Sequence, residues 1–324
     1  MTLFWIAVFI FSLALLVKSA DWLLVSAERI GLSWGLSPFI VGVVIVGLGT
    51  SFPEFAASVA AVYQGVTEIV VANAVGSNIA NILLVVGLAA IIGKKLEVNK
   101  NLIDLDLPLL IIATIFFVGV VYDGEIVFIE SVFLSILFII YFLYTIFYKD
   151  TEHKEFEEGR VEIIAEENPK ALVGKKVGAK EYGFLLIGVI GLVVGAHFLV
   201  DSVISLAEIF NIGVGVITLA AVALGTSLPE LTVSIKAAVD KKPEVALGNI
   251  FGSNAFNLLL VVGVPGLFST LIVDNETLTL GLPVMIAATF IFLISGISRR
   301  IHIYEGAMYL AIYIFFLGTL LGVI

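Results

Sequence analysis

The chain carries the same polar sequence twice, at a constant offset, inside otherwise apolar sequence. Residues 49–54 (GTSFPE) and 76–81 (GSNIAN) return as residues 225–230 (GTSLPE) and 252–257 (GSNAFN). Corresponding residues of the two copies lie the same distance apart in both motifs (225 − 49 = 252 − 76 = 176), so the two copies align without a gap. Each copy places a carboxylate inside hydrophobic sequence, where an ionisable group is costly and marks a functional site. The repeat therefore predicts a polar site inside a membrane, assembled from two halves.

The composition supports a polytopic membrane protein rather than a soluble domain. Hydrophobic residues make up 60% of the chain and charged residues only 14%, whereas soluble domains are far more polar. A spanning helix needs about 20 predominantly apolar residues. Ten such stretches are predicted, at 3–20, 36–62, 69–92, 103–121, 126–148, 182–200, 212–239, 244–267, 278–297 and 302–323. Because Cys is absent, disulfides, thiol catalysis and thiolate metal sites are excluded.

The positions of the basic residues predict the orientation. With ten spans, all 17 Lys and Arg residues fall at or in the odd-numbered connections, and cytoplasmic connections are enriched in these residues. Lys18 and Arg29 are assigned to the first connection, and Arg299 and Arg300 to the ninth. We therefore expect a multi-pass protein of the cell membrane with both termini outside.

The long polar stretch at 149–181 divides the chain. It predicts a cytoplasmic linker between a first five-span half, 1–148, and a second, 182–324. Because five is odd, the second half enters the membrane with the opposite polarity, so the repeats are inverted. Inverted repeats of transporters place the substrate site near the midplane, where interrupted helices of both halves meet. Glu54 and Glu230 should converge there.

The repeated motifs suit a hard cation. Pro53 and Pro229 should break or kink their helices, because proline lacks a backbone donor and clashes with the preceding turn. Helical spacing predicts Thr50 and Glu54 on one face, four residues apart, and the second copy repeats this arrangement. Carboxylate, hydroxyl, amide and carbonyl oxygens suit Ca²⁺ or Na⁺. Two carboxylates balance one divalent ion or a few monovalent ions.

Some of these polar residues also have a structural interpretation. Ser77 and Ser253 could let helices pack closely, and Asn78 and Asn254 could form hydrogen bonds between helices. His197 and Asp201 lie one helical turn apart near the outer end of the sixth stretch. They form either an interfacial hydrogen-bonded pair or a proton relay.

At these motifs the sequence closely resembles the cation/Ca²⁺ exchanger superfamily, in particular prokaryotic sodium/calcium exchanger-like proteins. The resemblance covers essentially the whole chain. It implies an all-α polytopic fold of ten transmembrane helices, with two inverted five-helix repeats and interrupted helices at the midplane. It also implies up to four central cation positions, and a first and sixth span that move together across the other eight.

The resemblance implies specific cation ligands. Glu54 and Glu230 would be the principal ones, and Gly47 and Ala223 match positions where the family uses backbone carbonyls for Na⁺. The remaining ligands would be hydroxyl, carbonyl or amide oxygens of Thr50, Ser51, Thr226, Ser227, Ser77, Ser253, Asn81 and Asn257.

One departure from the family pattern concerns Asn257. Several family branches carry Asp at this position, whereas this chain has Asn in both repeats. The resemblance associates K⁺ co-transport with an acid there, so K⁺ co-transport is not expected, and the Na⁺:Ca²⁺ stoichiometry stays open. Branches that use H⁺ have different acidic repeat motifs, which favours Na⁺.

These observations predict a secondary active antiporter that exchanges Na⁺ for Ca²⁺ by alternating access. The protein would not be an enzyme and would need no resident cofactor. Its partners would be the two ions and the lipid bilayer, with no nucleic acid and no obligate protein partner. The alternatives are an H⁺-coupled or other-divalent exchanger, because buried glutamates can titrate near neutral pH, an intramembrane acid/base enzyme and a passive cation channel.

Overall fold

The computed structural model describes residues 1–34, 49–97, 106–152, 177–241 and 243–324. Four short β-strands join its helices: β1 (Lys95–Glu97), β2 (Glu125–Ile126), β3 (Leu271–Ile272) and β4 (Arg300–His302). The α-helices are α1 (Thr2–Ser33), α4 (Phe52–Tyr63), α5 (Glu68–Ile79), α6 (Gly87–Gly93), α7 (Leu107–Val121), α8 (Phe128–Glu152), α10 (Ala179–Phe210), α11 (Val214–Ile217), α12 (Ala223–Thr226), α13 (Leu228–Val239), α14 (Pro243–Phe256), α15 (Val262–Gly266), α16 (Leu282–Ile297) and α17 (Ile303–Leu320). The π-helices are η2 (Ala80–Val86), η5 (Thr218–Val222), η6 (Asn257–Val261) and η7 (Thr277–Gly281).

The described helices follow the predicted spans in order. Seven of them are long and apolar enough to cross a membrane, and the bent segment from Val214 to Val239 makes an eighth. α7 is shorter, and the predicted span at 36–62 begins in residues outside the described ranges. α8 continues to Glu152 and α10 begins at Ala179, so both ends of the predicted 149–181 linker are helical.

The two halves repeat each other in space as well as in sequence. α4 and α13 begin and end at positions related by the offset of the sequence repeat (228 − 52 = 239 − 63 = 176). The strands follow the same rule: Leu96 pairs with Ile301, and Ile272 pairs with Glu125. The second pairing is the first one shifted by the same offset (272 − 96 = 301 − 125 = 176). Each small sheet therefore joins one strand from each half.

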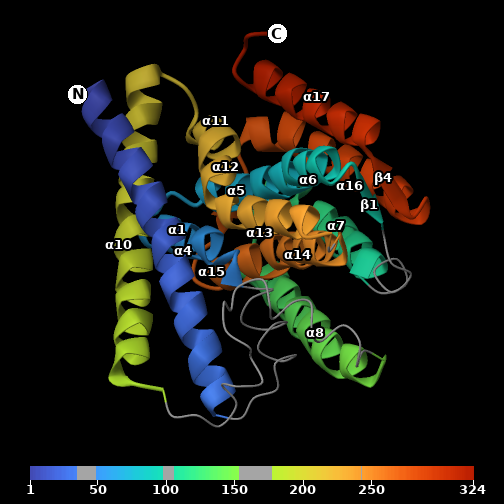
Figure 1. The fold of residues 1–324 in the computed structure, drawn as a ribbon. Helices are drawn as coiled ribbons and strands as arrows, with labels where there is room; N and C mark the ends of the chain where they lie inside the picture. Colours follow the sequence, from blue (N-terminus) through green and yellow to red (C-terminus); the bar gives the residue numbers. More distant parts are fainter. Residues whose placement is uncertain (35–48, 98–105, 153–176, 242) are drawn as a thin grey trace.

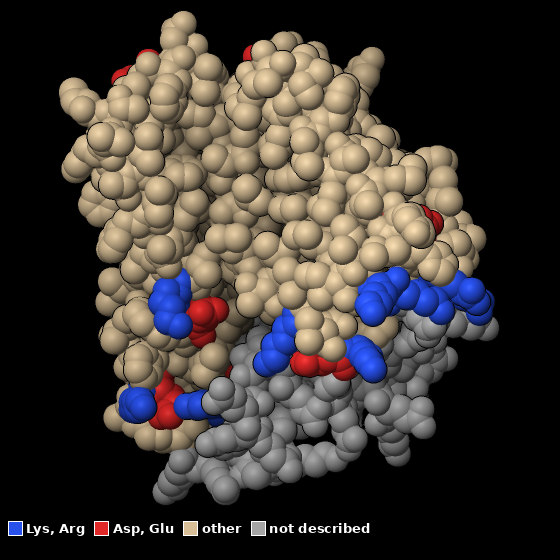
Figure 2. Space-filling model, turned by 45° about the horizontal axis from the view of Figure 1, so that its top comes forward, with Lys and Arg blue, Asp and Glu red and all other residues tan. Residues whose placement is uncertain are grey.

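The two sheets lie at opposite ends of the bundle. The backbone N–H of Ile272, in β3, donates to Thr67 just before α5, while β1 begins just after α6, at the far end of the same 26-residue helical segment. We call the end with β1 and β4 the basic end, after Lys94, Lys95, Arg299 and Arg300, and the end with β2 and β3 the acidic end, after Asp123, Glu125, Asp274 and Glu276. On the face drawn in Figure 2, Lys and Arg gather toward one edge.

Two long helices stand against the remaining bundle. α1 and α10 lie side by side in Figure 1, where the blue and yellow-green ribbons run along one flank of the molecule. The chain allows this close approach with glycines on α10: a Cβ at Gly188 would lie 2.9 Å from backbone atoms of α1, and one at Gly195 would lie 3.1 Å from Leu16. Small residues at a helix interface permit such packing in membranes.

α1 is longer than the sequence analysis predicted. The apolar stretch at 3–20 is only part of a 32-residue helix that continues to Ser33. Lys18 and Arg29 therefore lie on a helix rather than in a connection. Both are exposed enough to keep their charges in water, with 59% and 42% of their side-chain surfaces accessible. Hydropathy located the apolar part of the helix but not the amphipathic turns that follow.

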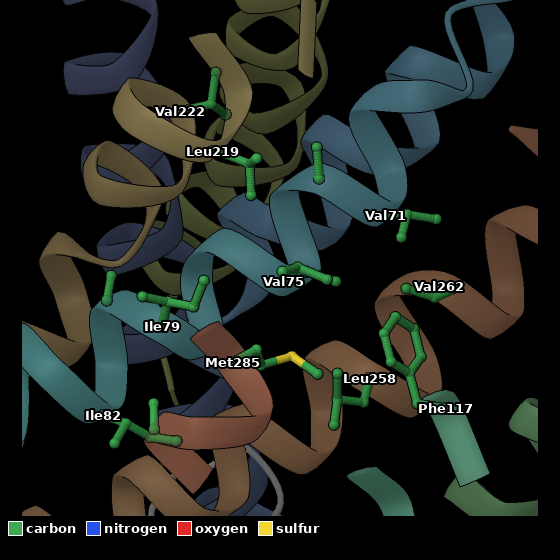
Figure 3. Packing of buried hydrophobic residues seen from close by; sticks show 14 of the residues in the cluster. Val71, Val75, Ile79, Ile82, Phe117, Leu219, Val222, Leu258, Val262 and Met285 are labelled. Carbon is green, nitrogen blue, oxygen red and sulfur yellow. The ribbon is translucent and has the colours of Figure 1, made fainter. Parts of the chain in front are cut away.

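The apolar core surrounds the helix that carries the first GSNxxN motif. Val71, Val75 and Ile79 recur every four residues on α5, so they lie along one face. Figure 3 shows them packed among side chains of η5, η6, α7, α15 and α16. All three are fully buried. This packing fixes α5, and with it the polar residues on its other faces.

Candidate cation-binding site

The prolines mark helix starts rather than kinks within continuous helices. In the second copy, α12 ends at Thr226, α13 begins at Leu228, and the two segments are bent by 45°. Pro229 occupies the first turn of α13, where no backbone N–H is needed. Pro53 has the same place in α4. The predicted interruption is confirmed at Ser227.

This interruption corrects one expectation. Thr226 and Glu230 lie on different helices, and Thr50 lies in a turn before α4. The predicted arrangement of threonine and glutamate on one helical face is therefore wrong in both repeats. The break instead turns Ser51 and Ser227, the residues at the start of α4 and α13, toward the opposite repeat.

The two repeats meet through crossed hydrogen bonds between serine and glutamate. Ser51 donates to Glu230 Oε1 at 2.9 Å, and Ser227 donates to Glu54 Oε1 at 3.3 Å. Both glutamates are fully buried. Because each serine lies three residues before the glutamate of its own repeat, these bonds bring the two acids together at the contact between the halves.

The asparagines pair in the same crossed manner. Asn81 Nδ2 donates to Asn254 Oδ1 at 3.0 Å, and Asn257 Nδ2 donates to Asn78 Oδ1 at 3.2 Å. Asn78 also donates to the backbone carbonyl of Asn254 at 3.2 Å. These bonds place the NH₂ groups of Asn81 and Asn257 on the neighbouring amides and leave their Oδ1 atoms without a partner.

A set of buried oxygen atoms at this junction has no hydrogen-bond partner among the described residues. Its members belong to residues that are fully buried, and they are Glu54 Oε2, Glu230 Oε2, Ser77 Oγ, Asn81 Oδ1 and Asn257 Oδ1. Buried polar atoms are normally satisfied, so such a cluster needs an explanation. Every atom in the set can accept or coordinate, and two belong to carboxyl groups. The arrangement suits a cation.

The repeats differ in how their hydroxyls are used. Ser253 donates to Glu230 Oε1 at 3.1 Å, whereas Ser77 makes no bond. Thr226 donates to the carbonyl of Val222 in its own helical segment at 3.1 Å, whereas Thr50 lies 3.4 Å from Ser253 Oγ. The site is therefore only approximately symmetric.

Gly47 and Ala223 are predicted to bind Na⁺ through their backbone carbonyls, and the structure describes only Ala223. The Ala223 carbonyl accepts the backbone N–H of Ser227 at 3.1 Å and lies 3.4 Å from the Thr226 hydroxyl, so both of its lone pairs already face a donor. Gly47 lies outside the described residues.

Asn73 and Asn249 also belong to the site, although neither was predicted as part of it. Asn73 Nδ2 donates to the backbone carbonyl of Glu54 at 3.2 Å, and Asn249 Nδ2 lies 3.5 Å from the carbonyl of Glu230. Each also lies 3.4 Å from a serine of the glutamate's helix, Ser58 or Ser234 respectively. The signal was present, because the two asparagines are related by the offset of the repeat (249 − 73 = 176). Extending the comparison of the repeats toward the N-terminus of each motif would have found them.

Removing one of these supports should weaken cation binding without removing a proposed ligand. Asn73→Leu keeps approximate size but deletes the donor to the Glu54 carbonyl, which costs about 1–3 kcal/mol for a buried group left unpaired. We expect the Ca²⁺ concentration for half-maximal flux to rise about tenfold, and Asn249→Leu to behave alike. Asn275→Leu, at an exposed position, is the control, and unchanged affinity in both buried variants would contradict this role.

The comparisons with known proteins identify the family of the chain. The family described as sodium/calcium exchanger protein matches residues 4–147 and 180–322. The chain belongs to the sodium/calcium exchanger family. Its members are transporters, so the chain is a membrane antiporter of the cation/Ca²⁺ class and not an enzyme.

Individual relatives of this exchanger cover nearly its full length. The sodium/calcium exchanger MaX1 of Methanosarcina acetivorans is 32% identical, with 97% of each chain covered. The inner membrane protein YrbG of Escherichia coli is 31% identical over 88% of this chain and 86% of the relative. A structure of the sodium-calcium exchanger NCX_Mj soaked with Na⁺ and Sr²⁺ matches with a TM-score of 0.65 at 32% identity, covering 97% of this chain and 98% of that one. The predicted helical fold of two inverted repeats is therefore confirmed, and the described residues supply seven spanning helices and an eighth, bent span.

Proposed function

We propose that this exchanger moves Ca²⁺ against Na⁺ through the junction between its repeats. The observation that carries the proposal is the group of five buried, unpartnered oxygen atoms around Glu54 and Glu230. Two carboxylates can balance one Ca²⁺ or share a few Na⁺ ions, so both ions would compete for the same oxygens. The relative MaX1 bears the name sodium/calcium exchanger, which supports this choice of ions.

A cavity at one end of the bundle reaches Thr50 at this junction and would give ions a route to it. It has a volume of about 300 Å³ and lies between α1 and α13. The exposed residues Asp21 and Lys236 line it, and so does Thr50, which is buried at 1% exposure. Lys236 lies in the last turn of α13, close to the end of α6 and thus to the basic end. We assign the basic end to the cytoplasm because Lys and Arg are enriched there.

The proposed mechanism depends on the unfavourable energy of the site when it holds no cation. With no cation bound, two carboxylates at membrane depth would repel each other and remain unsatisfied, so passage between access states is unfavourable. Either Ca²⁺ or Na⁺ neutralises them and permits the change. A ligand shifts such an equilibrium only by its difference in affinity for the two states. Exchange rather than leak follows, and an inward Na⁺ gradient would drive Ca²⁺ out.

Flux in liposomes tests the coupling ion. Purified protein is reconstituted into Na⁺-loaded liposomes and diluted into Na⁺-free medium that contains ⁴⁵Ca²⁺, and uptake is expected only when Na⁺ is inside. A parallel set without Na⁺ but with a pH gradient tests the H⁺-coupled alternative. Uptake driven by the pH gradient alone would reject Na⁺ coupling, and steady conductance without exchange would indicate a channel.

A further inference from the structure

The helices that flank the site are packed differently at the two ends of the bundle. α10 and α4 are in direct contact near the acidic end, whereas the cavity separates α1 from α13 near the basic end. The repeat relates these pairs, since α1 corresponds to α10 and α4 to α13. Among the described residues, the helices on this side of the bundle are therefore packed closely toward the acidic end and leave a cavity toward the basic end.

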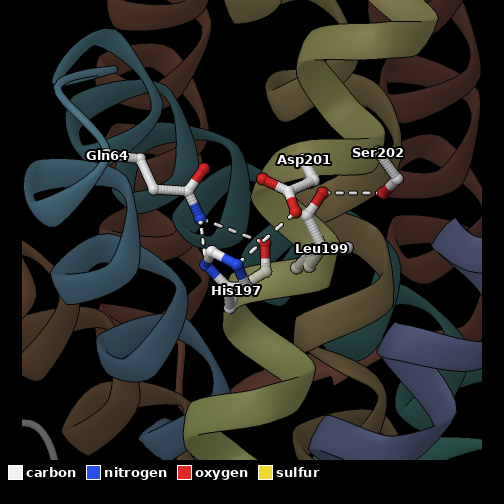
Figure 4. A network of polar contacts seen from close by, with 5 residues as sticks. All are labelled: Gln64, His197, Leu199, Asp201 and Ser202. Carbon is white, nitrogen blue, oxygen red and sulfur yellow. Dashed lines mark hydrogen bonds and ion pairs between the residues drawn. The ribbon is translucent and has the colours of Figure 1, made fainter.

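A polar bridge joins α10 to the end of α4 on the closed side. Gln64, which directly follows α4, has its Nε2 at 2.9 Å from His197 Nδ1 and at 3.1 Å from the His197 carbonyl. Figure 4 shows the Gln64 side chain reaching across to the imidazole of α10. Because an amide nitrogen only donates, Nδ1 must accept, and the neutral ring then carries its proton on Nε2. That nitrogen lies 3.6 Å from Asp201 Oδ2.

At the other end, the described positions that correspond to this pair form no such bridge. Subtracting 176 from His197 gives Asp21, and adding 176 to Gln64 gives Asp240. Two carboxylates cannot form the amide–imidazole bond, and they repel when brought together. Both side chains are exposed in the structure, and Asp21 lines the open cavity.

The faces of α4 and α13 also differ in a way that favours closer packing at the acidic end. On α13, the cavity is lined by Thr232, Val233 and Lys236. The corresponding positions of α4 are the alanines 56, 57 and 60, and Ala57 is fully buried. Small residues allow helices to approach closely in membranes, so α4 offers α10 a flatter surface than α13 offers α1. None of these residues belongs to the proposed cation ligands.

We propose that Gln64 and His197 latch the acidic end shut and thereby make the arrangement open at the basic end the preferred one of the two access states. The inference rests on alternating access, which is part of the proposed function, but it concerns the balance between the two access states and not the identity of the coupled ion. Differences between the two repeats outside the ion site therefore set the ratio of the two access states.

Two engineered cysteines report the state of each end without any transport measurement. The chain contains no Cys, so Ala57→Cys reports opening at the acidic end and Val233→Cys reports opening at the basic end. The two positions correspond by the repeat (233 − 57 = 176). Labelling rates with a membrane-impermeant maleimide are measured on purified protein in buffer with saturating Na⁺, because a bound cation permits passage between the two access states.

Breaking the latch should shift both reporters in opposite directions. Gln64→Ala and His197→Ala each remove the bridge and should change the ratio of the two states roughly fivefold. We expect faster labelling at Ala57→Cys and slower labelling at Val233→Cys. Tyr63→Ala, a neighbouring and 89% exposed position, should change neither rate.

Adding the same bridge at the basic end should favour closure of that end. The double substitution Asp21→His with Asp240→Gln copies the bridge to the basic end, and it should slow labelling at Val233→Cys while the original latch is intact. Unchanged rates in all these variants, or a rise at both reporters together, would overturn the proposal. Labelling measures accessibility and not flux. It therefore tests this proposal even if the liposome experiment shows no Na⁺ coupling.

Discussion

Replacing either Glu54 or Glu230 with glutamine is expected to abolish Ca²⁺ flux while leaving the protein folded. Both side chains are fully buried, and each leaves one carboxyl oxygen without a partner. Glutamine preserves shape and still accepts the bond from Ser227 or Ser51, but it removes half of the formal charge that faces the cation. Losing a charge-assisted contact of about 3 kcal/mol lowers affinity by more than one hundredfold.

The same variants should lose the stabilisation that bound Ca²⁺ provides. A ligand that binds only the folded protein raises its unfolding temperature, so Ca²⁺ should raise the melting temperature of the wild type and not that of Glu54→Gln or Glu230→Gln. In ion-free buffer both variants should be at least as stable as the wild type, because the repulsion between two buried acids is relieved. Glu125→Gln, at the exposed acidic end, is the matched control. Wild-type-like flux in either buried variant would exclude this site.

Gly76→Val is expected to destabilise the protein and to abolish flux, although Gly76 carries no ligand atom. A Cβ at this position would lie 2.7 Å from the Cβ of Ala223 and 3.1 Å from backbone atoms of Leu219. Backbone cannot move aside as a flexible side chain can, so η5 and α12 must shift, and they carry Thr226. Overpacking of this kind costs about 1–3 kcal/mol.

Gly119 provides a control with the same chemistry. It lies in α7, and a Cβ there would meet nothing within 4 Å among the described residues. Gly119→Val should therefore leave both the melting temperature and the flux close to wild type. The two variants are compared by thermal unfolding in detergent and by Na⁺-dependent ⁴⁵Ca²⁺ uptake. Equal behaviour of the two would show that the contact between α5 and α12 does not constrain the site.

Much of the architecture could be predicted because it depends on solvation and repetition. The apolar stretches predict spanning helices, and the constant offset of the repeat pairs each site residue with a counterpart. Boundaries were less accurate: α1 continues to Ser33 and α10 to Phe210, because these two helices pack against each other and hydropathy does not report that contact. Proline predicted an interruption, but its position in the first turn of α13 separates Thr226 from Glu230.

The sequence by itself determined that two inverted halves would bury two glutamates, several hydroxyls and paired asparagines inside a membrane. Only the tertiary structure decided that Ser51 bonds to Glu230 and Ser227 to Glu54, and that α1 stands away from α13 while α10 packs on α4. Local patterns fix which residues are buried, because burial follows from periodicity and hydropathy. Contacts between the halves depend on how two similar surfaces pack together. Residues outside the repeated motifs, such as Gln64 and His197, contribute to that packing.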